Sequence, residues 1–176
     1  MLELAILGFL HEAPLHGYEL RRRIAALSGH IKPVAESTLY PAIKRLENAG
    51  LLAREPQPGA AAAPRHMLSL TDEGRAELRR RLGDPAENDI SDENRWFTVL
   101  AFLRHLADPA AQAAVLRRRL AFLEEPSSFF YEGERPVRAE EVDDPFRRGV
   151  LIIARATSTA ELAWLRETLA GLDAAV

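Results

Sequence analysis

Residues 37–50 constrain the fold more than any other stretch, and they read Ser-Thr-Leu-Tyr-Pro-Ala-Ile-Lys-Arg-Leu-Glu-Asn-Ala-Gly. On a helix, successive residues lie about 100° apart. The apolar residues then share one side, namely Leu39, Ala42, Ile43 and Leu46. The other side is polar and cationic, with Ser37, Pro41, Lys44, Arg45 and Asn48 on it and Thr38 and Tyr40 flanking it. Ser37 or Thr38 is predicted to cap the first turn, and Gly50 to end the helix.

The polar side of this predicted helix suits the major groove of DNA. Short polar side chains there can read base edges, while cations meet phosphates. Only Glu47 carries the opposite charge, and it lies toward the side of the helix. The alternative is an ordinary amphipathic helix at a protein surface, which the same pattern allows.

Composition limits the class of protein. The 176 residues are 47% apolar and 28% charged, which is typical of one or two globular domains. There is no cysteine, so disulfides and zinc fingers are excluded. No apolar run reaches the roughly 18 residues of a membrane span. The first residues, Met1-Leu-Glu-Leu, carry an acid where a secretory signal carries cations, so we expect a cytoplasmic protein without a membrane partner.

Charge is divided unevenly along the chain. Residues 1–82 hold 12 Lys and Arg against 9 Asp and Glu, a net charge of +3. Residues 83–176 hold 11 against 17, a net charge of −6, which gives −3 in total. A basic half joined to an acidic half indicates that one part meets a polyanion and the other does not.

The order of predicted elements gives the N-terminal fold. One helix runs from about Met1 to Pro14, a second from His16 to Ser28-Gly29, and the stretch at 37–50 is the third. Two short apolar runs, 51–55 and 65–70, flank a segment rich in proline and predict a hairpin. Thr71 is predicted to cap a fourth helix that ends at Gly83. Three helices, a hairpin and a helix form a winged helix-turn-helix.

Three blocks of this region resemble the PadR family of transcriptional regulators. They are His16-Gly-Tyr-Glu-Leu, the stretch from Ser37 to Leu52, and Leu70-Thr-Asp-Glu-Gly, in the family's order and spacing. The resemblance implies a DNA-binding regulator, most often a repressor. The predicted wing departs from the family pattern, because it has an alanine run in place of basic residues and tyrosines. Arg54 and Arg65 remain its candidates for contacts with phosphate.

The C-terminal half is predicted to be helical and to form a homodimer. After a linker at 84–94, Asp108-Pro109 and Asp144-Pro145 are start signals for helices, the second reaching about Leu172. This long helix carries two apolar stripes, more than its own domain covers, so we expect a partner helix. The predicted interface residues are Phe146, Val150, Ile153, Ala160, Trp164 and Leu169. The segment Ala160-Glu-Leu-Ala-Trp-Leu also resembles the virulence-activator-like subgroup of the family, which implies a dimer formed by these helices.

The predicted fold class is therefore mainly α, an N-terminal winged helix-turn-helix with a C-terminal α-helical dimerisation domain. The predicted boundaries are 1–83 for the DNA-binding domain, 84–94 for the linker and 95–176 for the dimerisation and effector domain. Residues predicted to contact DNA are Arg21, Arg22, Ser37, Thr38, Tyr40, Lys44, Arg45, Asn48, Arg54 and Arg65. Lys44 and Arg45 are expected on phosphate or guanine, and Asn48 on a base.

Aromatic side chains of the C-terminal half are candidates for a regulatory pocket. Trp96, Phe97 and Trp164 lie on helices expected near the dimer seam, where flat rings could hold a small aromatic effector. The alternative is that these rings fill the core and the interface, where aromatic residues bury the largest area.

Catalytic and metal-binding signatures are weak. His11 and His16 have no metal-ligand spacing, and Ser127-Ser128 has no base at an interpretable distance in sequence. We expect no metal, no cofactor and no enzyme activity. The arginine triplets 79–81 and 117–119 are interpreted as solvated helix faces. The main functional hypothesis is a homodimer that binds an operator, an inverted repeat in double-stranded DNA. Two alternatives stay open, namely a winged-helix module that binds protein and an enzyme.

Overall fold

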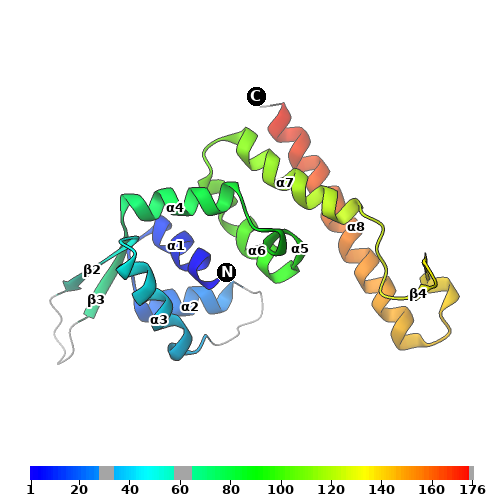
Figure 1. Cartoon of the computed structure of the whole chain (residues 1–176), viewed down its shortest axis with the longest axis horizontal. Coiled ribbons are helices and arrows are strands. Elements are labelled where there is room, and N and C mark those ends of the chain that lie inside the picture. The colour runs from blue at the N-terminus through cyan, green and yellow to red at the C-terminus, as the bar shows by residue number, and fades with distance from the viewer. Residues whose placement is uncertain (28–33, 58–64, 175–176) are drawn as a thin grey trace. The chain divides into compact units, whose positions relative to one another are not determined.

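The computed structural model describes residues 1–27, 34–57 and 65–174, without the side chains of residues 57 and 65. The chain forms two compact units, Met1–Ala107 and Asp108–Val176 (Figure 1). The predicted helix stop at Ser28-Gly29, the wing tip and the side chain of Arg65 lie outside the described residues.

The first unit is built around α1 (Leu2–Glu12), which packs against α2 (Gly17–Ala26) and α3 (Glu36–Asn48). Helix α1 contributes the largest share of the core because its apolar residues occupy most of its circumference. Its buried residues are Leu4, Ala5, Ile6, Leu7 and Leu10. All three helices were predicted from periodicity, and their bounds agree with the expected ones to within a few residues.

A small antiparallel sheet completes the winged helix. Strands β2 (Leu52–Gln57) and β3 (Arg65–Leu70) form the predicted hairpin, in which Leu52 pairs with Leu70. A short strand that was not predicted, β1 (Leu15–His16), pairs with the other edge of β3 and gives the order β1-β3-β2. Two residues are too few to show a strand pattern in the sequence.

Helix α4 (Asp72–Gly83) follows the hairpin and begins as predicted. The Thr71 hydroxyl accepts a hydrogen bond from the Gly74 N–H at 3.0 Å and donates to the Gly50 carbonyl at 2.8 Å. Gly74 is tightly enclosed, since a Cβ at this position would lie 2.1 Å from the Leu51 carbonyl oxygen. The start of α4 is thus joined directly to the end of the turn that follows α3.

The first unit extends beyond its predicted boundary. The predicted linker at 84–94 contains α5 (Glu87–Ser91), and α6 (Glu93–Phe102) with the 3₁₀ turn η1 (Leu103–His105) also belongs to this unit. The reason is packing: Ile90, Trp96 and Phe102 are buried, and the Phe102 ring lies 5.0 Å from that of Phe9 in α1. The acidic and amide residues that suggested a linker are exposed, except for Asp89, which is half-buried and paired with Arg95.

The second unit is a helical pair with an irregular connection. Helix α7 (Pro109–Glu124) is followed by strands β4 (Tyr131–Glu132) and β5 (Arg135–Pro136), the 3₁₀ turn η2 (Ala139–Glu141) and the long α8 (Pro145–Asp173). Asp108 and Asp144 cap α7 and α8 as predicted. Helix α7 packs on the C-terminal half of α8, where Leu165 and Leu169 are buried. Among the described residues, no helix is long and apolar enough to cross a membrane.

A buried ion pair joins the two helices. The Arg119 side chain is 4% exposed and that of Glu161 is 12% exposed. Arg119 Nε donates to Glu161 Oε1 at 2.7 Å, and Nη2 donates to Oε2 at 2.9 Å. The interpretation of residues 117–119 as a solvated face is therefore wrong for Arg119, since this face of α7 meets α8.

Candidate nucleic-acid interface

Helix α3 has the two-sided character expected of it. Leu39, Ala42, Ile43 and Leu46 are buried. All the predicted contact residues on this helix are exposed, namely Ser37, Thr38, Tyr40, Lys44, Arg45 and Asn48. Gly50 ends the turn after the helix with φ of +72°, a left-handed conformation that favours glycine.

The start of α3 differs from the prediction. The helix begins at Glu36, and Ala35 is the N-cap residue without a side-chain hydrogen bond. Ser37 and Thr38 lie inside the first turn, so they are not caps and keep their hydroxyls at the exposed surface. Glu36 adds an acid at this end, which the stretch beginning at Ser37 did not include.

Lys44 lies near the centre of the outward face. With about 100° per residue, Ser37, Lys44 and Asn48 point within about 30° of the direction opposite the buried side. Tyr40 and Arg45 lie about 70° to either side of that direction. Lys44 is therefore the cation best placed to enter a groove, and Arg45 lies at the edge that faces α1.

Three of the five predicted cationic residues whose side chains are described are paired with carboxylates of the same unit. Arg21 of α2 pairs with Glu36, Arg45 pairs with Glu3 of α1, and Arg54 of β2 donates to Glu47 with Nε at 2.5 Å and Nη2 at 3.1 Å. Lys44 and Arg22 have no partner within the described part of the chain. The N-terminal unit thus presents fewer free cations than its sequence suggests.

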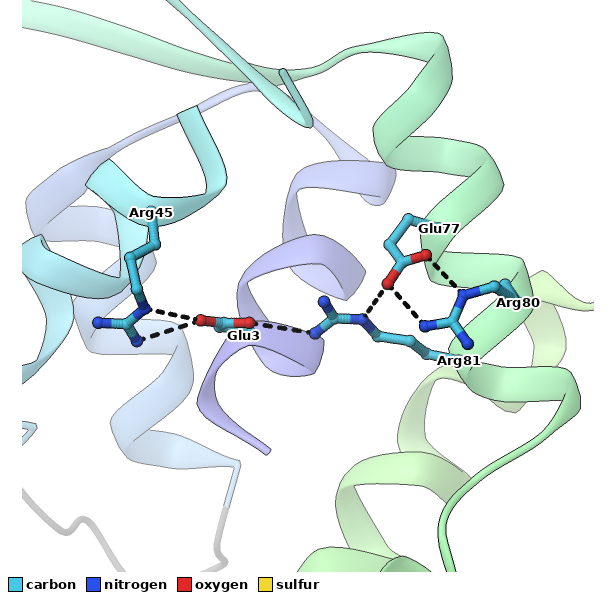
Figure 2. A network of polar contacts seen from close by, with 5 residues as sticks. All are labelled: Glu3, Arg45, Glu77, Arg80 and Arg81. Carbon is cyan, nitrogen blue, oxygen red and sulfur yellow. Dashed lines mark hydrogen bonds and ion pairs between the residues drawn. The ribbon is translucent and has the colours of Figure 1, made fainter. Parts of the chain in front are cut away.

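Glu3 connects α3 to α4 through a chain of charged groups (Figure 2). Arg45 Nε donates to Glu3 Oε1 at 3.1 Å, and Arg81 Nη1 donates to Glu3 Oε2 at 3.2 Å. Arg81 Nε also donates to Glu77 at 2.7 Å. Hydrogen bonds from Arg80 and Arg81 lower the pKa of Glu77 to about 2, so this carboxylate stays charged at neutral pH.

Sequence reasoning gave Glu3 no role at the site. Its partner Arg45 is 42 residues away, and no local spacing indicates such a pair. Arg80 and Arg81 were interpreted as part of a solvated face, whereas both are held by Glu77. The sequence offered one signal, an acid in the first turn of a helix whose other residues are almost all apolar.

Helices α2 and α3 border a common hollow. It has a volume of about 470 Å³ and is lined by Tyr18, Arg21 and Arg22 from α2 and by Glu36 and Tyr40 from α3. The structure therefore places Arg21 and Arg22 of α2, which were predicted to contact DNA, beside α3.

The predicted aromatic pocket is corrected in one respect. Trp96 is fully buried, at 0% exposure, in the core of the first unit, so its ring has no face free for a ligand. Phe97 on the same helix and Trp164 in the second unit are about half exposed. Periodicity placed Trp96 on an apolar face but did not show that this face is buried within the first unit.

The predicted dimer residues fall on two faces of α8. Phe146, Val150, Ile153, Ala160 and Trp164 form one exposed stripe, in which Phe146 is 85% and Ile153 is 69% exposed. Leu169 is buried against α7 within its own unit. Its assignment to the interface is therefore wrong, because the stripe that contains it is the one that α7 covers.

No metal-binding cluster occurs among the described residues. The rings of His11 and His105 lie 4.4 Å apart between centroids. Burial lowers the pKa of both histidines, which favours neutral rings packed in the core.

The sheet order, the helix order and the exposed outward face of α3 define residues 1–83 as a winged helix-turn-helix. Residues 6–80 match the model of the transcriptional regulator PadR-like family. The N-terminal domain is therefore a PadR-like domain, and this match confirms the resemblance seen in the sequence. No curated protein matches the chain.

Comparison with solved structures finds similarity along almost the whole chain. Bacillus subtilis PadR in complex with operator DNA is 23% identical over 97% of this chain and 98% of that chain, with a TM-score of 0.45. The same protein in complex with p-coumaric acid is 24% identical over 98% of both chains, with a TM-score of 0.42. The Vibrio cholerae virulence activator AphA is 18% identical over 100% of both chains, with a TM-score of 0.38.

Proposed function

We propose that this chain is a sequence-specific DNA-binding transcriptional regulator that binds an inverted repeat as a homodimer and acts as a repressor. The observation that carries the proposal is the outward face of α3. It presents exposed polar side chains around Lys44, within a domain that matches a family of transcriptional regulators.

The proposed contacts divide into two kinds. Lys44 and Asn48, near the centre of the face, are assigned to base edges or the nearest phosphates in the major groove. Arg45, at the edge of the face that lies toward α1, is assigned to phosphate or guanine. Ser37, Thr38 and Tyr40 are assigned to the backbone near the start of the helix. Arg21 and Arg22 of α2 and Arg54 and Arg65 of the hairpin are assigned to flanking phosphates.

Replacing Lys44 with alanine is expected to weaken operator binding. If Lys44 reads a base, the binding free energy should fall by about 1–3 kcal/mol. If it touches phosphate, the affinity should depend less steeply on salt concentration. Fluorescence anisotropy on the DNA upstream of the chain's own gene measures both. Arg79→Ala is the matched control, because Arg79 is an exposed cation of the same unit on α4. Unchanged affinity and slope in Lys44→Ala would contradict the assignment.

A second candidate function is a winged-helix module that binds protein. It is supported by the pairing of Arg21, Arg45 and Arg54 with carboxylates, which lowers the attraction of this surface for DNA. Binding to a DNA duplex at low salt distinguishes the two functions. A DNA-binding domain binds any duplex weakly under this condition, whereas a protein-binding module binds none.

The proposed homodimer is formed by the exposed stripe of α8. Large apolar side chains at this exposure are unusual in a monomer and common in the cores of interfaces. A dimer also supplies two recognition helices, so the expected operator has half-sites about 10 base pairs apart, or a multiple of this. A small aromatic effector stays part of the proposal, and the half-exposed rings of Phe97 and of Trp164 are separate candidates for contacting it.

Replacing Ile153 with aspartate is expected to convert the dimer to a monomer, since each subunit would bury an unpaired charge in the interface. Light scattering at micromolar concentration measures the mass. The control is Ile152→Asp, which changes the adjacent and similarly exposed residue on a different face of α8. A wild-type monomer, or equal dissociation by both variants, would contradict the proposed interface.

A further inference from the structure

Three of the arginines proposed to contact DNA are held by acids in the free chain. Arg21 pairs with Glu36, Arg54 with Glu47, and Arg45 with Glu3. A phosphate must displace a carboxylate before it can pair fully with one of these guanidinium groups. Lys44 and Arg22 carry no such restraint within the described residues.

The Glu3 pair differs from the other two because Glu3 has a second cation. One of its carboxylate oxygens lies 3.1 Å from Arg45 Nε and Nη2, and the other lies 3.2 Å from Arg81 Nη1 (Figure 2). Arg81 is in turn held by Glu77 at 2.7 Å. Glu3 therefore keeps a partner and its position when Arg45 leaves, and it can recapture the guanidinium.

We propose that Glu3 is a positioning residue that keeps Arg45 away from the phosphates of unrelated DNA and so lowers the affinity of the chain for such DNA. This inference rests on the proposed function. Binding to unrelated sequences comes almost entirely from phosphate contacts, so each restrained cation weakens it directly. A target sequence adds base contacts, which can offset the cost of separating Arg45 from Glu3.

The test replaces Glu3 with glutamine in the full chain and measures binding to a short duplex of unrelated sequence over a range of salt. The affinity is expected to rise about 2–5-fold, the equivalent of one exposed ion pair. The slope of log K against log salt should steepen by about 0.9, since Arg45 gains one phosphate. The matched control is Glu93→Gln, which removes the same charge from an exposed position on α6.

An Arg45→Ala background shows whether the effect passes through Arg45. There, Glu3→Gln is expected to change binding no more than Glu93→Gln does. A gain that persists in this background overturns the inference, because Glu3 would then act on DNA only as a general negative charge.

An NMR measurement on the wild-type protein tests the inference without requiring that the Glu3→Gln variant fold. The Nε–H resonance of Arg45, assigned by its loss in Arg45→Lys, should stay in place when unrelated duplex is added. A shift of this resonance, or equal binding by the wild type and Glu3→Gln, overturns the inference and leaves the proposed function intact. If neither protein binds any duplex at low salt, the proposed function fails, and the inference fails with it.

Discussion

Replacing Gly74 with alanine is expected to destabilise the first unit by about 3 kcal/mol, the upper end of the usual cost of overpacking. The added methyl would lie 2.1 Å from the Leu51 carbonyl oxygen and 3.0 Å from a Leu70 side-chain carbon. The Leu51 carbonyl cannot move away freely, because it accepts a hydrogen bond from the Thr71 N–H at 3.2 Å. Either α4 shifts along its axis or the turn after α3 opens.

Urea unfolding followed by circular dichroism measures this loss. Gly83→Ala is the matched control, because it adds the same methyl to the same helix, where the nearest atom belongs to Leu106 at 3.9 Å. We expect that control to lie within about 0.5 kcal/mol of the wild type. Equal stability of the two variants would show that Gly74 is not enclosed as described.

Replacing Glu161 with leucine is expected to cost about 3–5 kcal/mol in the second unit. The change removes a carboxylate that accepts two hydrogen bonds from the guanidinium of Arg119, and that group is nearly inaccessible to water. The double variant Arg119→Met, Glu161→Leu should recover most of the loss, because buried ion pairs can often be replaced by apolar side chains of similar volume.

Chemical denaturation of the single and double variants completes this comparison. Asp173→Ala is the control, since Asp173 pairs with Arg117 between the same two helices but both groups are about half exposed. Its effect should stay below about 1 kcal/mol. A loss in Glu161→Leu no larger than that of Asp173→Ala would contradict the assigned role of the buried pair.

Structural features that depend on residues close together in the sequence were predictable from the sequence. Helix α3 follows from the spacing of Leu39, Ile43 and Leu46, and the start of α4 follows from Thr71 and the acids after it. The hairpin follows from two apolar runs with turn residues between them. These signals depend only on local periodicity and capping, so one sequence is enough to find them.

Features that depend on distant residues were not predictable in this way. Periodicity shows that Trp96 and Leu169 lie on apolar faces, but not that both side chains are buried within their own units. The extension of the first compact unit to Ala107 was not predicted for the same reason, because Phe102 packs against Phe9 of α1. At the candidate interface, the exposed residues of α3 were found, whereas the pair between Glu3 and Arg45 joins segments with no shared local pattern.

The contact between Gly8 and Phe102 bears on how this protein is synthesised. Gly8 leaves room for the Phe102 ring, and a Cβ at this position would lie 2.5 Å from it. Since domains emerge from the ribosome N-terminus first, the winged helix is exposed with one side of α1 uncovered until α6 has been translated. We therefore expect the nascent N-terminal unit to acquire its full stability only after translation has passed residue 102, well after α3 has emerged.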